Sequence, residues 1–196
     1  AWVIGQFMHC EDLLDGGRMK KVLGGPHVQR FRWTRALGDS TLEMDITLRR
    51  GVPRLEYTLR VDWREIGDKQ QTPHLRVRFP LAIEDPQPRY EIPFGSLERP
   101  LRSGQEVPAL RWADLSAPDG AGVTLANRSK YGFAVEGHTL SMTLLRASSD
   151  PDPLPDLGEH VIEWALVPHG KGWGVGRSVQ AGELTNLPPV VLSCGF

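Results

Sequence analysis

The stretch LEYTLRVDW (residues 55–63) decides the fold class. Apolar side chains stand at every second position from Leu55 to Trp63, and polar or charged side chains fill the positions between them. Successive side chains on a β-strand point to opposite faces, so this pattern supplies one face for a core and one for water. The stretch therefore predicts a half-buried β-strand.

The same period of two recurs along most of the chain. It is seen in VQRFRWT (28–34) and LEMDITLR (42–49), and again in LRVRF (75–79). Further strands are expected at 89–94, 109–114, 122–126, 139–145, 161–167 and 190–193. Turn residues separate these segments, and no helical crossover interrupts them. The sequence therefore predicts an all-β fold: a large antiparallel β-sandwich that forms a single domain over residues 1–196.

Little of the chain is left for helices. It has 16 prolines and 21 glycines, and only residues 12–14 suggest a short helical turn. The glycines at every second position from Gly170 to Gly176 predict a flexible loop that presents Trp173, with no helix after it.

Composition excludes several functional classes. The chain has 40% hydrophobic and 24% charged residues, which is typical of a globular protein and unlike a disordered one. A net charge of −1 provides no overall field for nucleic acid or an anionic membrane, so neither is expected as a partner. The only cysteines, Cys10 and Cys194, are expected to be reduced thiols in a cytoplasmic protein.

Two segments interleave arginines with aromatic or apolar residues, namely RFRW (30–33) and RVRF (76–79). Strand alternation explains both, because it sends the arginines to the wet face and the other residues to the core. Acidic residues on neighbouring wet faces are expected to pair with the arginines across strands. These acids are Glu43, Asp45, Glu56 and Asp62.

The sequence offers no complete catalytic or metal-binding set. His9 and Cys10 are adjacent, so on a strand they would point to opposite faces. No HExxH, CxxC, His-x-Asp or GxSxG pattern occurs in the sequence. We therefore expect neither catalytic residues nor metal ligands within this chain.

Two polar loops have alternative interpretations. DPDPLPDLGEH (150–160) carries three aspartates on a proline-stiffened segment, which suits either calcium or sugar hydroxyls, or else a rigid solvated connection. NRSKYG (127–132) is a polar turn that places several functional groups together.

Several sequence blocks follow one another in a characteristic order, and they include YEIPFG (90–95), RWADLS (111–116), NRSKYG (127–132), LLR (144–146), PDP (151–153) and Asp156-x-Gly158-x-His160. Together they resemble the C-terminal β-domain of glycoside hydrolase family 38, the α-mannosidases, and most of all its bacterial, vacuolar and cytosolic branch. The resemblance implies a supersandwich of the galactose mutarotase-like kind. It also implies a part in the retaining hydrolysis of α-linked mannose.

In that family the nucleophile and a divalent metal, usually zinc, belong to an N-terminal barrel with a His-x-Asp-x-x-Trp motif. This sequence has no such motif, so the resemblance implies a fragment of a longer chain whose catalytic barrel is absent. The expected partners are that barrel and a mannose-containing oligosaccharide, with a possible homo-oligomer of the parent. The fragment itself is expected to hold no cofactor and to hydrolyse nothing alone.

The resemblance also names candidate substrate-binding residues. Arg146 matches a family arginine near the sugar pocket, Asn127, Lys130 and Tyr131 match the neighbouring turn, and Asp156 and His160 match the following loop. Two departures are Asn127-Arg128, where an Asn-Asp pair is common, and Ala147-Ser148-Ser149 in place of a Ser-Pro start. The main alternative is a free-standing carbohydrate-binding β-sandwich that stacks sugars on Trp112, Tyr131 and Trp173. A scaffold for oligomer contacts is a third possibility.

Overall fold

A computed structural model describes residues 9–101, 105–172, 174–187, 189–190 and 192. The elements in these ranges are β1 (Arg18–Gly24), β2 (Val28–Leu37), β3 (Ser40–Arg49), β4 (Val52–Trp63), β5 (His74–Pro80), β6 (Gln87–Ile92), β7 (Gly95–Glu98), β8 (Val107–Pro108), β9 (Trp112–Ser116), β10 (Gly122–Asn127), β11 (Gly132–Glu136), β12 (Thr139–Arg146), β13 (Gly158–His169) and α1 (Val175–Asn186).

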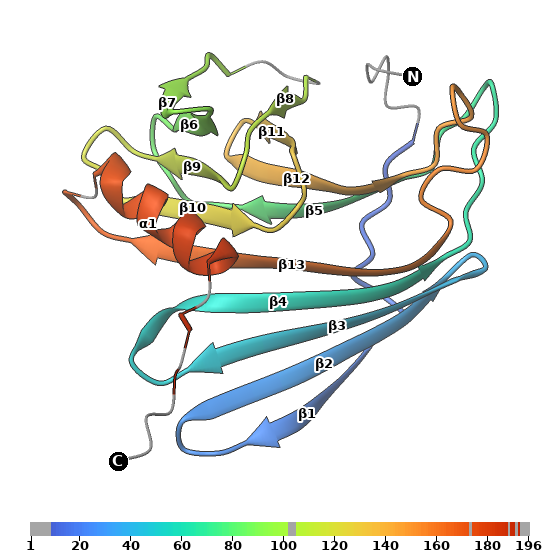
Figure 1. The fold of residues 1–196 in the computed structure, drawn as a ribbon, viewed down its shortest axis with the longest axis horizontal. Helices are drawn as coiled ribbons and strands as arrows, with labels where there is room; N and C mark the ends of the chain where they lie inside the picture. The colour runs from blue at the N-terminus through green and yellow to red at the C-terminus, as the bar shows by residue number, and fades with distance from the viewer. Residues whose placement is uncertain (1–8, 102–104, 173, 188, 191, 193–196) are drawn as a thin grey trace.

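The strands form two sheets that pack face to face (Figure 1). The larger sheet has nine strands in the order β1-β2-β3-β4-β13-β10-β9-β6-β7, and the smaller has four in the order β5-β12-β11-β8. Every neighbouring pair is antiparallel, as in β4 with β13 or β5 with β12. The predicted all-β, antiparallel sandwich is thus confirmed.

The core lies between the two sheets. Its largest side chains, all under 2% exposed, include Trp63 and Trp164 from the nine-stranded sheet and Phe133 and Met142 from the smaller one. Tyr57 stacks on Trp164, with ring centroids 5.2 Å apart and the planes 6° from parallel. Across the sheets, Tyr57 on β4 meets Phe79 on β5 with ring centroids 6.1 Å apart, and apolar residues of 55–63 and 139–145 share one core, as period-two patterning predicts.

Coverage by the smaller sheet ends near β4, and we call strands β1 to β3 the wing because they extend beyond it (Figure 1). Along β3 the inward-facing side chains pass from Leu42, 4% exposed, to Leu48, 47% exposed, and Phe31 on β2 is 41% exposed. The sequence predicts one uniformly buried face for the strands at 28–34 and 42–49, which are β2 and β3. That prediction is wrong for the outer part of the wing, because no described element covers it.

Helix α1 covers the opposite face of the nine-stranded sheet, over β9, β10 and β13. A Cβ atom on Gly182 would lie 2.7 Å from Cδ1 of Trp112, so glycine permits this close approach. Beside it, the buried carboxylate of Asp114 accepts hydrogen bonds from Thr124 (2.5 Å) and Ser178 (3.2 Å) and contacts His169 Nε2 (2.9 Å). A buried polar junction therefore ties the helix to the sheet.

The helix corrects the expectation that none follows the glycine-rich segment. Gly174 is the N-cap and Gly176 lies exposed in the first turn, whereas the buried residues of α1 are the small side chains Ser178, Ala181 and Gly182, which suit packing on the sheet. Conversely, the short helical turn expected at 12–14 is a non-helical turn, and residues 190 and 192 are not in a strand. Trp173 and the rest of 190–193 lie outside the described residues.

Sequence reasoning also missed β1, β7, β8 and β11. All seven residues of β1 are exposed, so RMKKVLG shows no alternation between a core and a wet face. In the part of the chain that the structure describes, no helix is long and apolar enough to cross a membrane.

Candidate functional site

The singled-out residues gather around the turn after β10 and the loop between β12 and β13. Asp156, with φ +61°, organises this loop. One of its carboxylate oxygens accepts a hydrogen bond from the backbone N–H of Arg146 (3.0 Å), and its carbonyl oxygen lies 2.6 Å from His160 Nε2. The two ends of the loop are thereby held against each other.

Lys130 lies within electrostatic reach of the same loop. Burial lowers the pKa of the Lys130 ammonium, and the negative charge of Asp156 opposes that shift. The structure therefore brings together four predicted residues: Lys130, Arg146, Asp156 and His160.

A β-bulge sets the direction of Arg146. In the pairing of β12 with β5, Thr143 lies opposite Arg76 but Arg146 lies opposite His74, because the register shifts between Thr143 and Leu145. Leu144 is the extra residue, and it is buried like its neighbour Leu145. The shift places Arg146 on the same face of the sheet as Thr143, which regular alternation would forbid.

That face carries polar residues that sequence reasoning did not single out. His74 Nε2 lies 2.8 Å from Thr143 Oγ1, and the Thr143 hydroxyl donates to Glu106. Arg76 donates to the Ser141 hydroxyl (2.6 Å), and its Nε lies 3.7 Å from Glu106 Oε1. The four-stranded sheet thus has a polar outer cluster that leads to Arg146.

The electrostatics of this cluster suppress protonation of His74. Burial, reinforced by the positive charges of Arg76 and Arg146, lowers the pKa of His74 from 6.5 to about 4. The ring is therefore neutral at pH 7. The sequence signal for the cluster was weak, because His74 and Thr143 are 69 positions apart and Glu106 belongs to no regular pattern.

The remaining two predicted residues, Asn127 and Tyr131, differ in their exposure to solvent. Asn127 is 0% exposed, and its amide donates to the carbonyl of Leu110 (3.0 Å) and accepts from the backbone N–H of Lys130 (2.9 Å). Tyr131 is 57% exposed. Asn127 thus shapes the turn from inside, whereas Tyr131 can meet a ligand or another domain.

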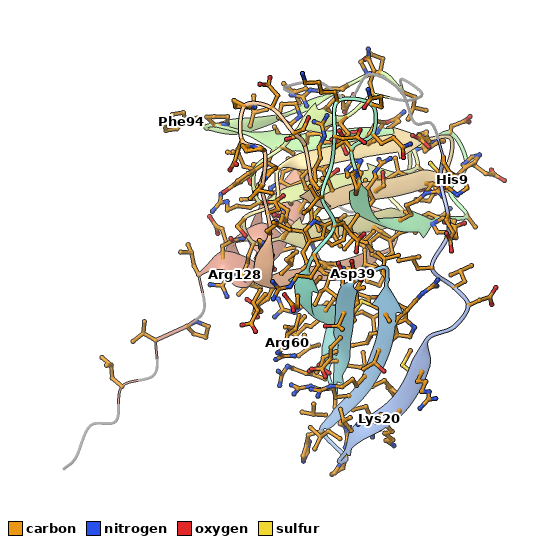
Figure 2. The ribbon with its side chains drawn as sticks, turned by 90° about the vertical axis from the view of Figure 1, so that its right-hand side faces the viewer. His9, Lys20, Asp39, Arg60, Phe94 and Arg128 are labelled. Carbon is orange, nitrogen blue, oxygen red and sulfur yellow. The ribbon has the colours of Figure 1, made fainter. Side chains whose placement is uncertain are left out.

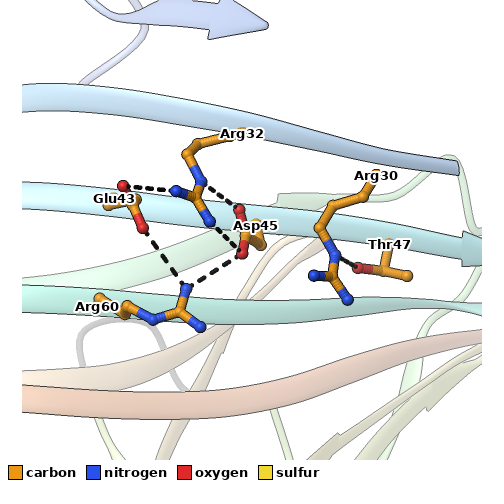
Figure 3. A network of polar contacts seen from close by, with 6 residues as sticks. All are labelled: Arg30, Arg32, Glu43, Asp45, Thr47 and Arg60. Atoms are coloured by element: carbon orange, nitrogen blue, oxygen red, sulfur yellow. Dashed lines mark hydrogen bonds and ion pairs between the residues drawn. The ribbon is translucent and has the colours of Figure 1, made fainter. Parts of the chain in front are cut away.

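A second polar network lies on the outer face of the wing (Figure 3). Arg32 grips Asp45 by two hydrogen bonds (2.7 and 3.0 Å), and Arg60 donates to the same carboxylate (3.1 Å). These contacts lower the pKa of Asp45, first through the hydrogen bond from Arg32. Figure 2 shows Arg60 and Arg128 on one side of the molecule and His9 on the other.

The predicted cross-strand pairing of arginines with acids is therefore confirmed for Arg32, whereas Arg30 donates to the Thr47 hydroxyl (3.0 Å). Glu56 and Asp62 pair with Arg49 and Arg64, which lie outside the two segments.

The pairing prediction is wrong for RVRF (76–79), whose arginines lie on the other sheet. There Arg78 reaches Asp12 (3.1 Å) and Arg76 reaches Glu106. Opposite them on β12 stand the hydroxyl residues Ser141 and Thr143 in place of acids.

Metal ligands do not gather in the described part of the chain, where no three His, Cys, Asp or Glu side chains could hold an ion. In the loop 150–160, Asp152 accepts the backbone N–H of Leu154 (3.0 Å) and Asp156 that of Arg146. These carboxylates thus stabilise the loop itself. No step of a reaction is assigned to a metal held by this chain.

Two further expectations concern single residues. Cys10 is exposed and carries a free thiol, while Cys194 lies outside the described residues, so the state of the pair stays a prediction. Trp112 is 0% exposed, so it cannot stack on a sugar. That burial removes one of the three aromatic residues on which a free-standing carbohydrate-binding module would depend.

Comparison with known proteins agrees with this architecture. Residues 1–154 match the sequence profile of the glycosyl hydrolases family 38 C-terminal domain. Alpha-mannosidase 2C1 of Mus musculus is 37% identical over 161 residues, which cover 79% of this chain and 15% of that protein. Alpha-mannosidase G of Dictyostelium discoideum is 32% identical over 139 residues, or 67% of this chain and 12% of that protein.

A solved structure of an alpha-mannosidase from Enterococcus faecalis V583 shares the fold. The superposition covers 85% of this chain and 23% of the Enterococcus faecalis chain, with a TM-score of 0.70 and 14% identity. The chain thus spans only a small part of the length of the relatives it matches. On the match over residues 1–154 and the identity to two α-mannosidases, the chain belongs to glycosyl hydrolase family 38, as its C-terminal domain.

Proposed function

We propose that this chain is the C-terminal β-sandwich of a retaining α-mannosidase, where it completes the sugar pocket and packs on the catalytic barrel. Family membership supports the enzyme class, and the placement of Arg146 supports the contribution to the pocket. The bulge in β12 brings this guanidinium to a strand end beside a constrained loop. Binding groups carried by a rigid sheet commonly occupy such loops.

The chemistry of the proposed contact follows from the guanidinium. Its planar fork donates two parallel hydrogen bonds, which suits vicinal sugar hydroxyls. Lys130 adds a donor nearby, His160 donates its Nε2–H to the Asp156 carbonyl and so leaves Nδ1 as an acceptor, and Tyr131 adds an exposed aromatic ring. Asn127 and Asp156 act by holding the turn and the loop in shape.

The partners proposed for the whole enzyme are the catalytic barrel of the same polypeptide and a mannose-containing oligosaccharide, with a homo-oligomer as a further possibility. The barrel would supply the nucleophile, the acid/base group and a divalent metal such as zinc. We also propose a cytoplasmic location, in line with the expectation that Cys10 and Cys194 are reduced thiols.

The test is replacement of Arg146 in the full-length parent enzyme. Arg146→Ala removes both charge and fork, and we expect kcat/KM on an aryl α-mannoside to fall roughly 10- to 1000-fold, or about 1.4–4 kcal/mol. Arg146→Lys keeps the charge but loses the fork, so it should also be impaired. The melting temperature should hardly move in either variant.

Two controls accompany this test. Arg78→Ala removes another arginine from the same sheet and should leave kcat/KM unchanged, because among the described residues its guanidinium pairs with the exposed Asp12. The 196-residue chain alone should release no mannose. Full activity of both Arg146 variants, or activity lost only in proportion to folding, would contradict the proposed function.

A further inference from the structure

A row of polar side chains on the outer face of the four-stranded sheet ends at Arg146. It begins at Glu106, just before β8, passes to Thr143 on β12 and then to His74 on β5. The side chains of Glu106 and His74 are only 19% and 10% exposed. Groups so enclosed act on a ligand through their neighbours more readily than by touching it.

The hydrogen-bond roles in this row follow from counting protons. The Thr143 hydroxyl has one proton, which it donates to the Glu106 carboxylate, because an ionised carboxylate only accepts. The bond between Thr143 Oγ1 and His74 Nε2 must then be donated by the ring, so Nε2 carries its proton. The low pKa of His74 agrees with a neutral ring in this tautomer.

Three observations relate Arg146 to this row and to the loop. His74 lies directly opposite Arg146 in the strand pairing, and the bulge puts both on the same face. The charge of Arg146 adds to the effects of burial and of Arg76 in lowering the pKa of His74. From the other side, Asp156 holds the backbone N–H of Arg146 at 3.0 Å.

We propose that Glu106, Thr143 and His74 are positioning residues: their hydrogen-bonded row fixes the ring of His74, which in turn fixes the direction of the Arg146 guanidinium. This inference rests on the proposed function, because it deepens the role of Arg146 at the sugar. The pairing of β5 with β12 fixes the distance between His74 and Arg146, and the hydrogen-bonded row fixes the orientation of the His74 ring. A guanidinium on a four-bond stem has many rotamers, so restricting it before the sugar arrives favours productive binding.

The central test is Thr143→Val in the full-length α-mannosidase. Valine keeps the branched shape but cannot relay the hydrogen bond from His74 to Glu106. We expect kcat/KM on an aryl α-mannoside to fall roughly 5- to 50-fold, as expected when a binding group is displaced. Thr143→Ser restores the hydroxyl and should recover most of the activity.

Thr139→Val is the matched control. Thr139 lies on the same strand and the same face, opposite Pro80 at the far end of the pairing, and away from Arg146. It should leave kcat/KM unchanged. Melting temperatures of all variants identify any that fail to fold, and Thr143→Ala, which removes the hydroxyl without adding a methyl group, replaces Thr143→Val if that variant is unstable.

A double-mutant cycle shows whether the row acts through Arg146. In the Arg146→Ala background, Thr143→Val should have no further effect, because nothing remains to be positioned. Losses that multiply would overturn the inference. So would a fully active Thr143→Val in an enzyme that Arg146→Ala impairs, and in that case the proposed function would still stand. If Arg146→Ala itself is harmless, the proposed function fails, and this inference fails with it.

Discussion

The wing and the four-stranded sheet both carry rows of arginines on their outer faces, but they neutralise them in different ways. On the wing, Arg32 faces Asp45 directly across the strands, so the charges are balanced in register. On the smaller sheet, Arg76 faces Thr143, and the balancing carboxylate of Glu106 comes from a distant segment. Where acids stand directly opposite arginines, the charges pair within the sheet and the network is structural. Where hydroxyl residues stand opposite arginines, the balancing acid comes from another segment, and this face of the sheet has room for a functional site.

Removal of the central acid of the wing should have the largest effect on stability. Asp45 is 3% exposed and accepts hydrogen bonds from both Arg32 and Arg60, so Asp45→Ala leaves these two cations with the more exposed Glu43 in place of a buried carboxylate. We expect the free energy of unfolding to fall by about 3 kcal/mol, as when one partner of a buried ion pair is removed. Urea denaturation of the chain measures this loss.

Glu43→Ala is the control within the same network. The Glu43 side chain is 34% exposed, so its removal should cost about 1 kcal/mol or less. Equal losses of unfolding free energy in Asp45→Ala and Glu43→Ala would contradict the idea that Asp45 is the buried acid on which this network depends.

Between pH 6.5 and 4, the His74 side of the molecule should lose about 2 kcal/mol of unfolding free energy, whereas the Asp45 network should lose almost none. His74 has a folded-state pKa of about 4, below its ordinary 6.5, so between these pH values the unfolded chain binds a proton that the folded chain refuses. Stability should therefore be complete above pH 6.5 and decline as the pH falls toward 4. Asp45 has a lowered pKa, so its contribution persists above pH 3.8 and is lost only below it.

The measurement is the pH dependence of urea denaturation for His74→Gln beside the unaltered chain. The variant should show a decline between pH 6.5 and 4 that is smaller by about 2 kcal/mol. His27→Gln serves as the control, because this residue lies in the turn between β1 and β2, outside the cluster. An unchanged slope in His74→Gln would contradict a neutral, enclosed ring.

The smallest effect should come from Arg78→Ala. This arginine belongs to the same RVRF segment, but its side chain is 44% exposed and its partner Asp12 is 63% exposed. Exposed ion pairs contribute little, so the free energy of unfolding should change by less than about 0.5 kcal/mol. A loss comparable to that of Asp45→Ala in urea denaturation would remove the distinction between the two faces.

The sequence predicts the sandwich well because period-two patterning reports directly which face of a strand meets the core. It fails where that relation breaks. β1 has no buried face, α1 packs through small residues such as Gly182, and Leu48 alternates correctly but finds no covering sheet. These failures concern tertiary coverage, which local patterning does not encode.

The residues of the candidate site also differ in whether local sequence could predict them. Arg146, Asp156 and His160 are close in sequence, so their proximity could be predicted from one segment. The bulge at Leu144 could have been suspected, since Leu144 and Leu145 are adjacent apolar residues in an alternating strand. Glu106 could not, because it meets Thr143 only through the pairing of separate strands.

The pairing of β4 with β13 has a consequence for how the chain assembles in time. Trp63 meets Gly158 and Leu55 meets Leu166, so this seam joins strands from distant parts of the chain. Until β13 is synthesised, β4 and β10 each expose an unpaired edge to the other, because β13 is the strand that lies between them. Closing so large a loop is slow compared with forming a hairpin. During translation the β1–β4 meander can form early as one local unit, but the sheet becomes continuous only when one late strand joins its two halves.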